Sequence, residues 1–268
     1  MENNPLNEPQ ILAEQKNTST FQKGKNMIAV ASGKRSVGKT WFSITLAHAL
    51  SSLKQKTLFF DADLGLSNID NQLGLSIEDD LGSVVSGHKT LNQIITSNDK
   101  TKFDIIAGRS GSAGLSTLPI GRLQILSEDL HLVSSSYQKV IMDMSSGTEK
   151  PVCILSGMAE KIIVICNDTP STLTEAYSYI RTMVSQYQKQ DIQIVINQAN
   201  SPREGERTFN TISKACQEFL KISPSLLGIV RNDTRIRDSI RNQVSILNRY
   251  PTSEASEDVI NIARKLLS

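Results

Sequence analysis

The chain has 268 residues, enough for one large α/β domain and too few for two of comfortable size. Its 29 basic and 27 acidic residues give a net charge of +2, which neither demands nor excludes a nucleic-acid partner. The three cysteines form no CxxC pair, which argues against an iron–sulfur cluster and favours buried thiols in a reducing compartment. No apolar stretch has the form of a signal peptide or reaches the ~18 residues of a membrane span, so we expect a cytoplasmic protein.

Residues 1–26 differ in composition from the rest of the chain. They are almost all polar and cannot bury enough apolar area to offset the entropy that is lost on ordering them. We therefore expect a flexible N-terminal tail over 1–26 and a single folded domain over 27–268.

Short apolar runs rich in Ile and Val alternate with helical patterns from residue 27 onward, which is typical of strands covered on both faces. In chain order we expect a strand at 27–32, a helix at 39–53, strands at 57–61 and 103–107, a helix at 121–136, strands at 139–143 and 161–166, a helix at 171–187, a strand at 192–197, a helix at 204–220, a strand at 226–230, and helices at 234–241 and 255–267, with Ser171 and Ser256 as N-caps. The alternation predicts an α/β fold: a doubly wound, mostly parallel sheet with helices on both faces. Ligands of such sheets bind at the carboxyl ends of the strands.

A phosphate-binding loop follows the first predicted strand and opens the first helix. Residues 33–40 read GKRSVGKT and match all four fixed positions of GxxxxGK[ST]. Gly33 and Gly38 let backbone N–H groups turn toward phosphate oxygens, and the helix N-terminus adds roughly half a positive charge there. We expect Lys39 to bridge the β- and γ-phosphates and Thr40 to ligate Mg²⁺. The nucleotide-binding residues predicted around this loop are Gly33, Lys34, Ser36, Val37, Gly38, Lys39, Thr40 and Trp41, the last of which also fits the core side of the helix.

The second lysine of the loop, Lys34, directly follows the first glycine. The pattern GKxxVGKT resembles the deviant Walker A loop of the MinD/ParA family, whose members are P-loop NTPases of the SIMIBI type. The resemblance implies that Lys34 reaches across an ATP-dependent homodimer to the partner's phosphates and is catalytic there; a solvent-facing lysine is the alternative. The usual Gly-Gly of the family is replaced by Arg35 and Ser36, whose side chains add bulk or charge at the dimer seam.

Three carboxylates, Asp61, Asp63 and Asp70, stand at and after the second predicted strand. The stretch from Asp61 to Asp70 resembles the switch I segment of MinD-like ATPases, with Gly65 permitting a sharp turn. By that match Asp63 orients the attacking water and Asp61 supports Mg²⁺ and its water shell. An acceptor near the γ-phosphate can align the nucleophile, which is a large part of phosphoryl-transfer catalysis.

The fourth long strand ends in Asp143, which has the Walker B form and is expected to bind Mg²⁺ through water. Gly147 supplies the switch II position whose N–H can sense the γ-phosphate. The family usually reads DTGAG or DSPAG, whereas Met144, Ser145 and Ser146 stand between Asp143 and Gly147 here.

Two residues after later strands are candidates for the base site. By the family resemblance Asn197 hydrogen-bonds the adenine, because its amide offers both a donor and an acceptor. Capping or turn formation is the alternative for Asn197. Asp233 is a second candidate, close to Arg231, where relatives commonly carry proline.

Segments outside the loop resemble the FlhG/FleN branch of the family, which regulates the number and placement of bacterial flagella: residues 81–95, 166–180, 196–220 and 226–266. The resemblance implies a slow, dimer-dependent ATPase with an FlhF-like GTPase or flagellar switch or transcription components as partners. The alternatives are a ParA- or MinD-like partitioning or positioning ATPase, and a nucleotide-binding adaptor with little turnover.

Two surface patterns bear on membrane and nucleic-acid contact. An apolar stripe on the last helix is expected to face the core, which leaves contact with the inner face of the cell membrane as a hypothesis; its residues are Ile260, Ala263, Leu266 and Leu267. A basic set is expected to be a solvated helical face rather than a DNA site; its residues are Arg231, Arg235, Arg237, Arg241 and Arg249. The N-terminal EPQILAEQ matches poorly the DQAxxLR segment with which the branch engages its GTPase.

Overall fold

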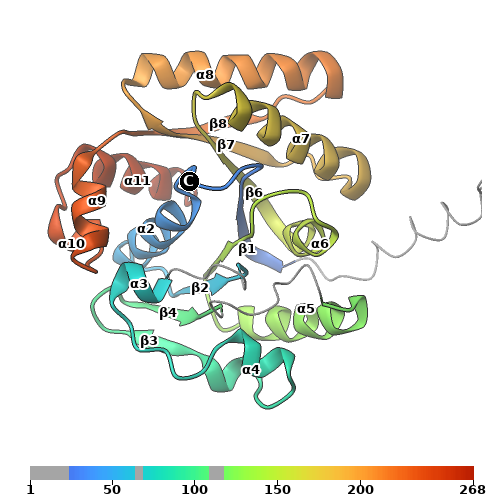
Figure 1. Cartoon of the computed structure of the whole chain (residues 1–268), viewed down its shortest axis with the longest axis vertical. Helices are drawn as coiled ribbons and strands as arrows, with labels where there is room; N and C mark the ends of the chain where they lie inside the picture. Colours follow the sequence, from blue (N-terminus) through green and yellow to red (C-terminus); the bar gives the residue numbers. More distant parts are fainter. Residues whose placement is uncertain (1–23, 64–68, 109–117) are drawn as a thin grey trace, which may run out of the picture.

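The structure, a computed structural model, describes residues 24–63, 69–108 and 118–268 (Figure 1). In this part of the chain one eight-stranded sheet has the order β3-β4-β2-β5-β1-β6-β7-β8. Every neighbouring pair is parallel except β3 and β4, which are antiparallel. The predicted doubly wound, mostly parallel α/β fold is therefore confirmed. Most of the predicted tail, residues 1–23, and Gly65 lie outside the described residues.

All seven predicted strands are present, and one further strand joins them. The strands are β1 Gly24–Ala31, β2 Thr57–Asp61, β3 Thr96–Asn98, β4 Phe103–Ile106, β5 Lys139–Asp143, β6 Ala159–Cys166, β7 Ile192–Ala199 and β8 Ser225–Arg231. The edge strand β3 was missed because three polar residues carry no apolar periodicity. β1 begins three residues earlier than predicted: the amide of Asn26 donates to the carbonyls of Ser134 and Tyr137, both at 2.7 Å, so this polar residue is satisfied inside the fold.

The long helices lie where the sequence predicts them, and short ones fill the connections. They are α2 Lys39–Ser52, α3 Ile69–Leu73, α4 Leu81–Val85, the 3₁₀ turn η2 Leu91–Ile94, α5 Ile120–Ser134, α6 Lys150–Met158, α7 Pro170–Tyr187, α8 Pro202–Ala215, the π-helical turn η4 Cys216–Leu220, α9 Thr234–Arg241, α10 Ile246–Arg249 and α11 Glu254–Lys265. Helix α6 was missed because KPVCILSGM has too few polar positions to show a helical period.

Both predicted N-caps are wrong. Helix α7 is capped by Thr169, because proline fits the first turn of a helix and Pro170 therefore extends the helix ahead of Ser171. Helix α11 is capped by Ser253, whose side chain accepts the N–H of Ser256. In each case the true cap lies two or three residues before the predicted one.

Helices on the two faces of the sheet bury two separate apolar cores (Figure 1). Alternate residues of β1 supply both: Met27 and Ala29 pack under α5, α6 and α7, whereas Ile28 and Val30 pack under α2 and α11. This is the period of two of a strand that is covered on both sides. The central strands are therefore packed on both faces, which fixes where their carboxyl ends lie.

The cysteines are buried as the sequence predicts, and the predicted core-facing stripe of the last helix is correct except at Leu267, which lies beyond the end of α11 at Lys265 and is exposed. Cys153, Cys166 and Cys216 are free and buried, and burial raises the pKa of Cys166 to about 12. In α11 the side chains of Ala263 and Leu266 lie in the core, and Leu267 is more exposed. Among the helices that the structure describes, none has the length and apolar content to cross a bilayer.

Candidate functional site

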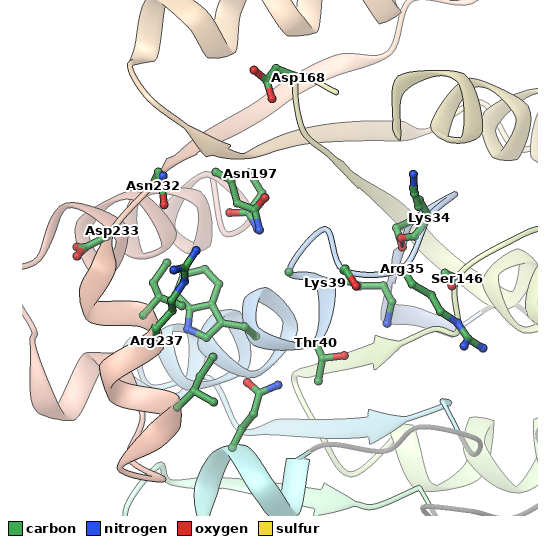
Figure 2. A pocket seen from close by; sticks show the side chains of 18 of the residues that line it. Lys34, Arg35, Lys39, Thr40, Ser146, Asp168, Asn197, Asn232, Asp233 and Arg237 are labelled. Carbon is green, nitrogen blue, oxygen red and sulfur yellow. Dashed lines mark hydrogen bonds between the residues drawn. The ribbon is translucent and has the colours of Figure 1, made fainter. Parts of the chain in front are cut away.

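A cavity of about 670 Å³ opens at the carboxyl ends of the strands (Figure 2). Its walls come from the loop between β1 and α2 and from the residues that follow β2, β5, β6, β7 and β8. In a doubly wound sheet this edge is where ligands bind, because loops of opposite winding diverge there. The predicted phosphate loop, Asp63, Asn197 and Asp233 are all brought together around this cavity.

Both glycines of the loop are required by sterics. Gly38 caps α2 with a φ of 82°, and a Cβ placed on it would lie 2.4 Å from the amide nitrogen of Asn197. A Cβ on Gly33 would lie 2.1 Å from the backbone carbon of Glu175 in α7. The loop therefore packs directly against α7 and β7, which fixes the direction in which its backbone points.

We expect Gly33→Ala to displace the loop from α7, to lower stability by about 1–3 kcal/mol and to weaken nucleotide binding. The matched control is Gly121→Ala, because nothing lies within 4 Å of a Cβ at Gly121 in α5. That control should keep or slightly raise stability, since alanine is the better helix former. Urea unfolding of both variants decides the matter: equal midpoints would show that the close approach of Gly33 to α7 is wrong.

The centre of the site is a buried ion pair between Lys39 and Asp143 (Figure 2 labels Lys39). The Nζ of Lys39 lies 2.7 Å from Oδ1 of Asp143, and the side chains are 8% and 0% exposed. The hydroxyl of Ser43, one turn into α2, donates to the same oxygen at 3.0 Å. The second oxygen, Oδ2 of Asp143, is buried and has no hydrogen-bond partner among the described residues. The site thus holds a buried cation at the head of a helix beside a carboxylate oxygen that can accept another ligand.

The other two predicted carboxylates of the strand ends differ in their surroundings. Asp61 is fully buried and is the register partner of Asp143 across β2 and β5. Its Oδ1 accepts the backbone N–H of Asp63 at 3.0 Å. Asp63 lines the cavity, whereas Asp70 lies in the first turn of α3 and is not among the lining residues.

The switch II glycine is already hydrogen-bonded. Gly147 has a φ of 103°, and its N–H donates to the carbonyl of Ser32 at 3.0 Å. This N–H is thus engaged by the phosphate loop, and Gly147 is not among the residues that line the cavity. Ser36, in the loop itself, also has a positive φ, of 66°.

Asn197 and Asp233, the two residues predicted for a base site, both line the cavity. The amide of Asn197 is 2% exposed and donates to the carbonyl of Val37 at 2.8 Å, so one of its N–H groups holds the phosphate loop. Asp233 caps α9 by accepting the N–H of Arg235. The oxygens Oδ1 of Asn197 and Oδ2 of Asp233 are buried without a hydrogen-bond partner in the part of the chain that the structure describes.

The cavity also has lining residues that sequence reasoning did not assign to it. They include Gln72, Asp168, Asn200, Asn232 and Arg237. Figure 2 shows Arg237 on α9 directed into the cavity, on the same side as Asp233. The helical spacing of four residues between Asp233 and Arg237 is the signal that identifies it. Trp41 lines the cavity and also packs into the core, so its predicted place on the core side of the helix is confirmed and its contact with a nucleotide stays a prediction.

Lys34, the second lysine of the loop, lies at the rim of the cavity. Its Nζ donates to Oγ of Ser171 in the first turn of α7 at 2.7 Å, in an exposed position. Figure 2 shows this side chain directed away from Lys39. Within one chain Lys34 is therefore held by α7 and does not point toward the phosphate end of the cavity.

Three of the five arginines in the predicted basic set have an acidic neighbour, and the third of them, Arg235, has its Nη1 3.9 Å from Oδ2 of Asp233. Arg231 pairs with Asp258 at 2.9 Å and Glu254 at 2.7 Å, and the hydrogen bond with Asp258 raises the pKa of Arg231. Arg249 pairs with Asp238 at 2.7 Å. Because nucleic-acid binding needs uncompensated cations, these pairs weaken the case for a phosphate-backbone surface here.

The fold, the phosphate loop and the buried lysine–carboxylate pair define a P-loop nucleotide-binding protein. A family model described as the CobQ/CobB/MinD/ParA nucleotide binding domain matches residues 28–246. That match runs from β1 to the start of α10 and covers most of the chain. The chain belongs to this family, and it is accordingly a nucleotide-binding protein of the MinD/ParA class of ATPases.

Curated relatives with similar sequences include regulators of flagella and of cell division. The antiactivator FleN of Pseudomonas aeruginosa is 28% identical over 244 residues, which cover 90% of this chain and 85% of that protein. The flagellum site-determining protein YlxH of Helicobacter pylori is 25% identical over 99% of this chain and 91% of that protein. The septum site-determining protein MinD of Bacillus subtilis is 27% identical over 90% of this chain and 88% of that protein. The predicted resemblance to the MinD/ParA family and its FlhG/FleN branch is confirmed.

Solved structures support the fold. MinD of Aquifex aeolicus has a TM-score of 0.74 and 23% identity, and the match covers 90% of this chain and 96% of that one. MinD of Pyrococcus horikoshii, solved in complex with Mg-ADP, has a TM-score of 0.72 and 20% identity over the same shares of the two chains. At these identities the likeness shows the architecture alone.

Proposed function

We propose that this chain is an ATPase that binds Mg·ATP at the head of α2 and uses the nucleotide as a dimerisation switch. The buried pair of Lys39 and Asp143 is the observation that carries the proposal. It supplies a phosphate-binding cation and a metal-side carboxylate at one place, beside the phosphate loop and the N-terminus of α2. The residues assigned to the phosphates are Gly33, Ser36, Val37, Gly38, Lys39 and Thr40.

Hydrolysis needs a water molecule aligned with the γ-phosphorus, and we assign that alignment to Asp63 because it lines the cavity after β2. The oxygen of the water bonds to the γ-phosphorus while the bond from that phosphorus to the bridging oxygen breaks. ADP leaves with the electron pair of the broken bond, and the phosphate keeps the oxygen of the water and releases its proton to the solvent. The N–H of Gly147 exchanges the carbonyl of Ser32 for the γ-phosphate.

The residues on the metal side fit Mg²⁺. Oδ2 of Asp143 is buried and has no hydrogen-bond partner among the described residues, which is costly unless another ligand satisfies it. Asp61 lies in register beside it, and Thr40 lines the cavity. These three residues would hold the ion, and bound Mg²⁺ supplies charge neutralisation at the β- and γ-phosphate oxygens.

The base end would accept adenine. The oxygens Oδ1 of Asn197 and Oδ2 of Asp233 are the acceptors for donors of the base or ribose, while the indole of Trp41 forms an apolar wall. Asn197 then has two roles, because its N–H also holds the loop at Val37.

Molecular mass in solution tests the switch. With a non-hydrolysable ATP analogue and Mg²⁺ we expect about twice the mass found with ADP, because only the γ-phosphate can draw a second chain's Lys34 to the site. Light scattering after gel filtration measures the difference directly. An unchanged mass would remove the switch and favour a nucleotide-binding adaptor with little turnover.

For the cellular role we propose control of the number or placement of flagella, with an FlhF-like GTPase or flagellar switch or transcription components as partners. Similarity to FleN and YlxH supports this role. We place the chain in the cytoplasm, where it would contact the inner face of the membrane only as a dimer. The alternative is a ParA- or MinD-like partitioning ATPase, which similarity to MinD supports. Flagella counted in cells that lack the chain, and ATP-dependent retention on DNA, separate the two.

A further inference from the structure

The register of two neighbouring strands brings residues 63 and 145 together. In the parallel pair of β2 and β5, Asp61 stands opposite Asp143, and the N–H of Ala62 donates to the carbonyl of Asp143 at 3.0 Å. Beyond each strand the backbone continues for two more residues in the same direction, to Asp63 after β2 and to Ser145 after β5. Asp63 and Ser145 consequently lie side by side at the edge of the sheet where the cavity opens.

A side-chain hydrogen bond joins these two residues. Oγ of Ser145 lies 3.2 Å from Oδ1 of Asp63 and 3.4 Å from the carbonyl of Ala62. A serine hydroxyl has one proton to donate, and an ionised carboxylate is the stronger acceptor of the two. The shorter, charge-assisted bond to Asp63 therefore dominates. It restricts the rotation of a carboxylate that is only partly buried.

The loop that carries Ser145 is itself fixed. The N–H of Met144 donates to the carbonyl of Val30, and the N–H of Gly147 donates to the carbonyl of Ser32, both at 3.0 Å. Both acceptors belong to β1 and its continuation into the phosphate loop. A side chain can orient another one only if its own backbone is held in place, because any movement of the orienting residue is passed on to the residue that it orients.

We propose that Ser145 is a positioning residue for Asp63, which it holds with the carboxylate at the cavity. The inference rests on the proposed function, in which Asp63 aligns the attacking water. Oδ1 of Asp63 accepts from Ser145, and its second oxygen serves as the acceptor for the water. Ser145 touches neither nucleotide nor water in this scheme and acts through Asp63.

The test separates turnover from binding. In Ser145→Ala we expect kcat to fall about tenfold with KM unchanged, which is the effect of losing one hydrogen bond to a charged group in the transition state. Ser145→Thr keeps the hydroxyl and should recover most of the turnover. Ser127→Ala is the matched control, because that hydroxyl donates to the carbonyl of Leu123 inside α5, and it should leave kcat unchanged.

Combination with Asp63→Ala shows whether Ser145 acts through Asp63. In that background Ser145→Ala should cause no further loss of kcat, since the group it orients is gone. An equal tenfold loss in both backgrounds would overturn the inference and leave the proposed function in place, and so would a normal kcat in Ser145→Ala alone. A normal kcat in Asp63→Ala would overturn both the inference and the proposed role of Asp63.

Discussion

Lys39→Ala should lose binding of Mg·ATP to the point where calorimetry detects no heat of association, at least a hundredfold loss of affinity. Two physical effects add in this variant. The cation that meets the phosphates is removed, and the carboxylate of Asp143 is left facing them with its charge uncompensated. In the wild-type chain the two groups are 2.7 Å apart and the carboxylate is fully buried.

The same substitution should also lower stability, so loss of binding alone would be ambiguous. Removing one partner of a buried ion pair costs about 3–5 kcal/mol, because the remaining charge stays out of water. We expect a fall in Tm of about 10 °C for a chain of this length. In the double variant Lys39→Ala/Asp143→Asn the buried charge is gone, and most of the stability should return without any return of binding. A double variant that binds Mg·ATP normally would show that Lys39 has no direct role at the phosphates.

The sequence predicted the phosphate loop and the strands because both depend on local residue types. Consecutive Ile and Val residues report burial on both faces of a strand, and alternate residues of β1 do enter different cores. The phosphate-loop motif also predicts its neighbours, since a strand must precede it and a helix must follow it. These signals need no information from distant parts of the chain.

The interactions that determine the chemistry of the site join residues far apart in the sequence, and no local sequence pattern predicts such contacts. Lys39 and Asp143 are 104 positions apart, and Asn197 holds the carbonyl of Val37 from 160 positions away. The prediction gave Asn197 to the base, with capping or turn formation as the alternative, whereas one of its N–H groups supports the phosphate loop at Val37. Such pairs appear only once the strand order is known, because β5, which ends in Asp143, lies directly beside β1, and β7, which carries Asn197, lies one strand farther on, past β6.

The N-cap of α7 was mispredicted because two local preferences compete. Ser171 has the residue type of an N-cap, but Pro170 before it can occupy the first turn and moves the cap to Thr169. The displaced serine then serves another purpose, since its hydroxyl accepts from Lys34 at 2.7 Å. Because Ser171 does not cap the helix, its hydroxyl is available to Lys34.

Lys34→Ala should leave the affinity for ATP nearly unchanged and lower dimer-stimulated turnover by about 10³–10⁵-fold, the contribution of a cation supplied across an interface. The exposed bond between Lys34 and Ser171 does not prevent this role. An exposed neutral acceptor contributes on the order of 1 kcal/mol, whereas a 10³–10⁵-fold rate effect corresponds to about 4–7 kcal/mol. Ser171→Ala is therefore the matched control, and its turnover should equal or slightly exceed that of the wild-type chain.

Mixed dimers decide whether Lys34 acts across the interface. Lys34→Ala and Asp63→Ala should each keep only a small residual fraction of wild-type turnover when assayed alone. In an equimolar mixture half of the dimers contain one chain of each kind. One of the two sites in such a dimer combines Asp63 of the first chain with Lys34 supplied by the second, so about a quarter of wild-type turnover should return. If Lys34 acted within its own chain, every site in the mixture would lack one of the two groups, and turnover would stay at the residual level of the single variants.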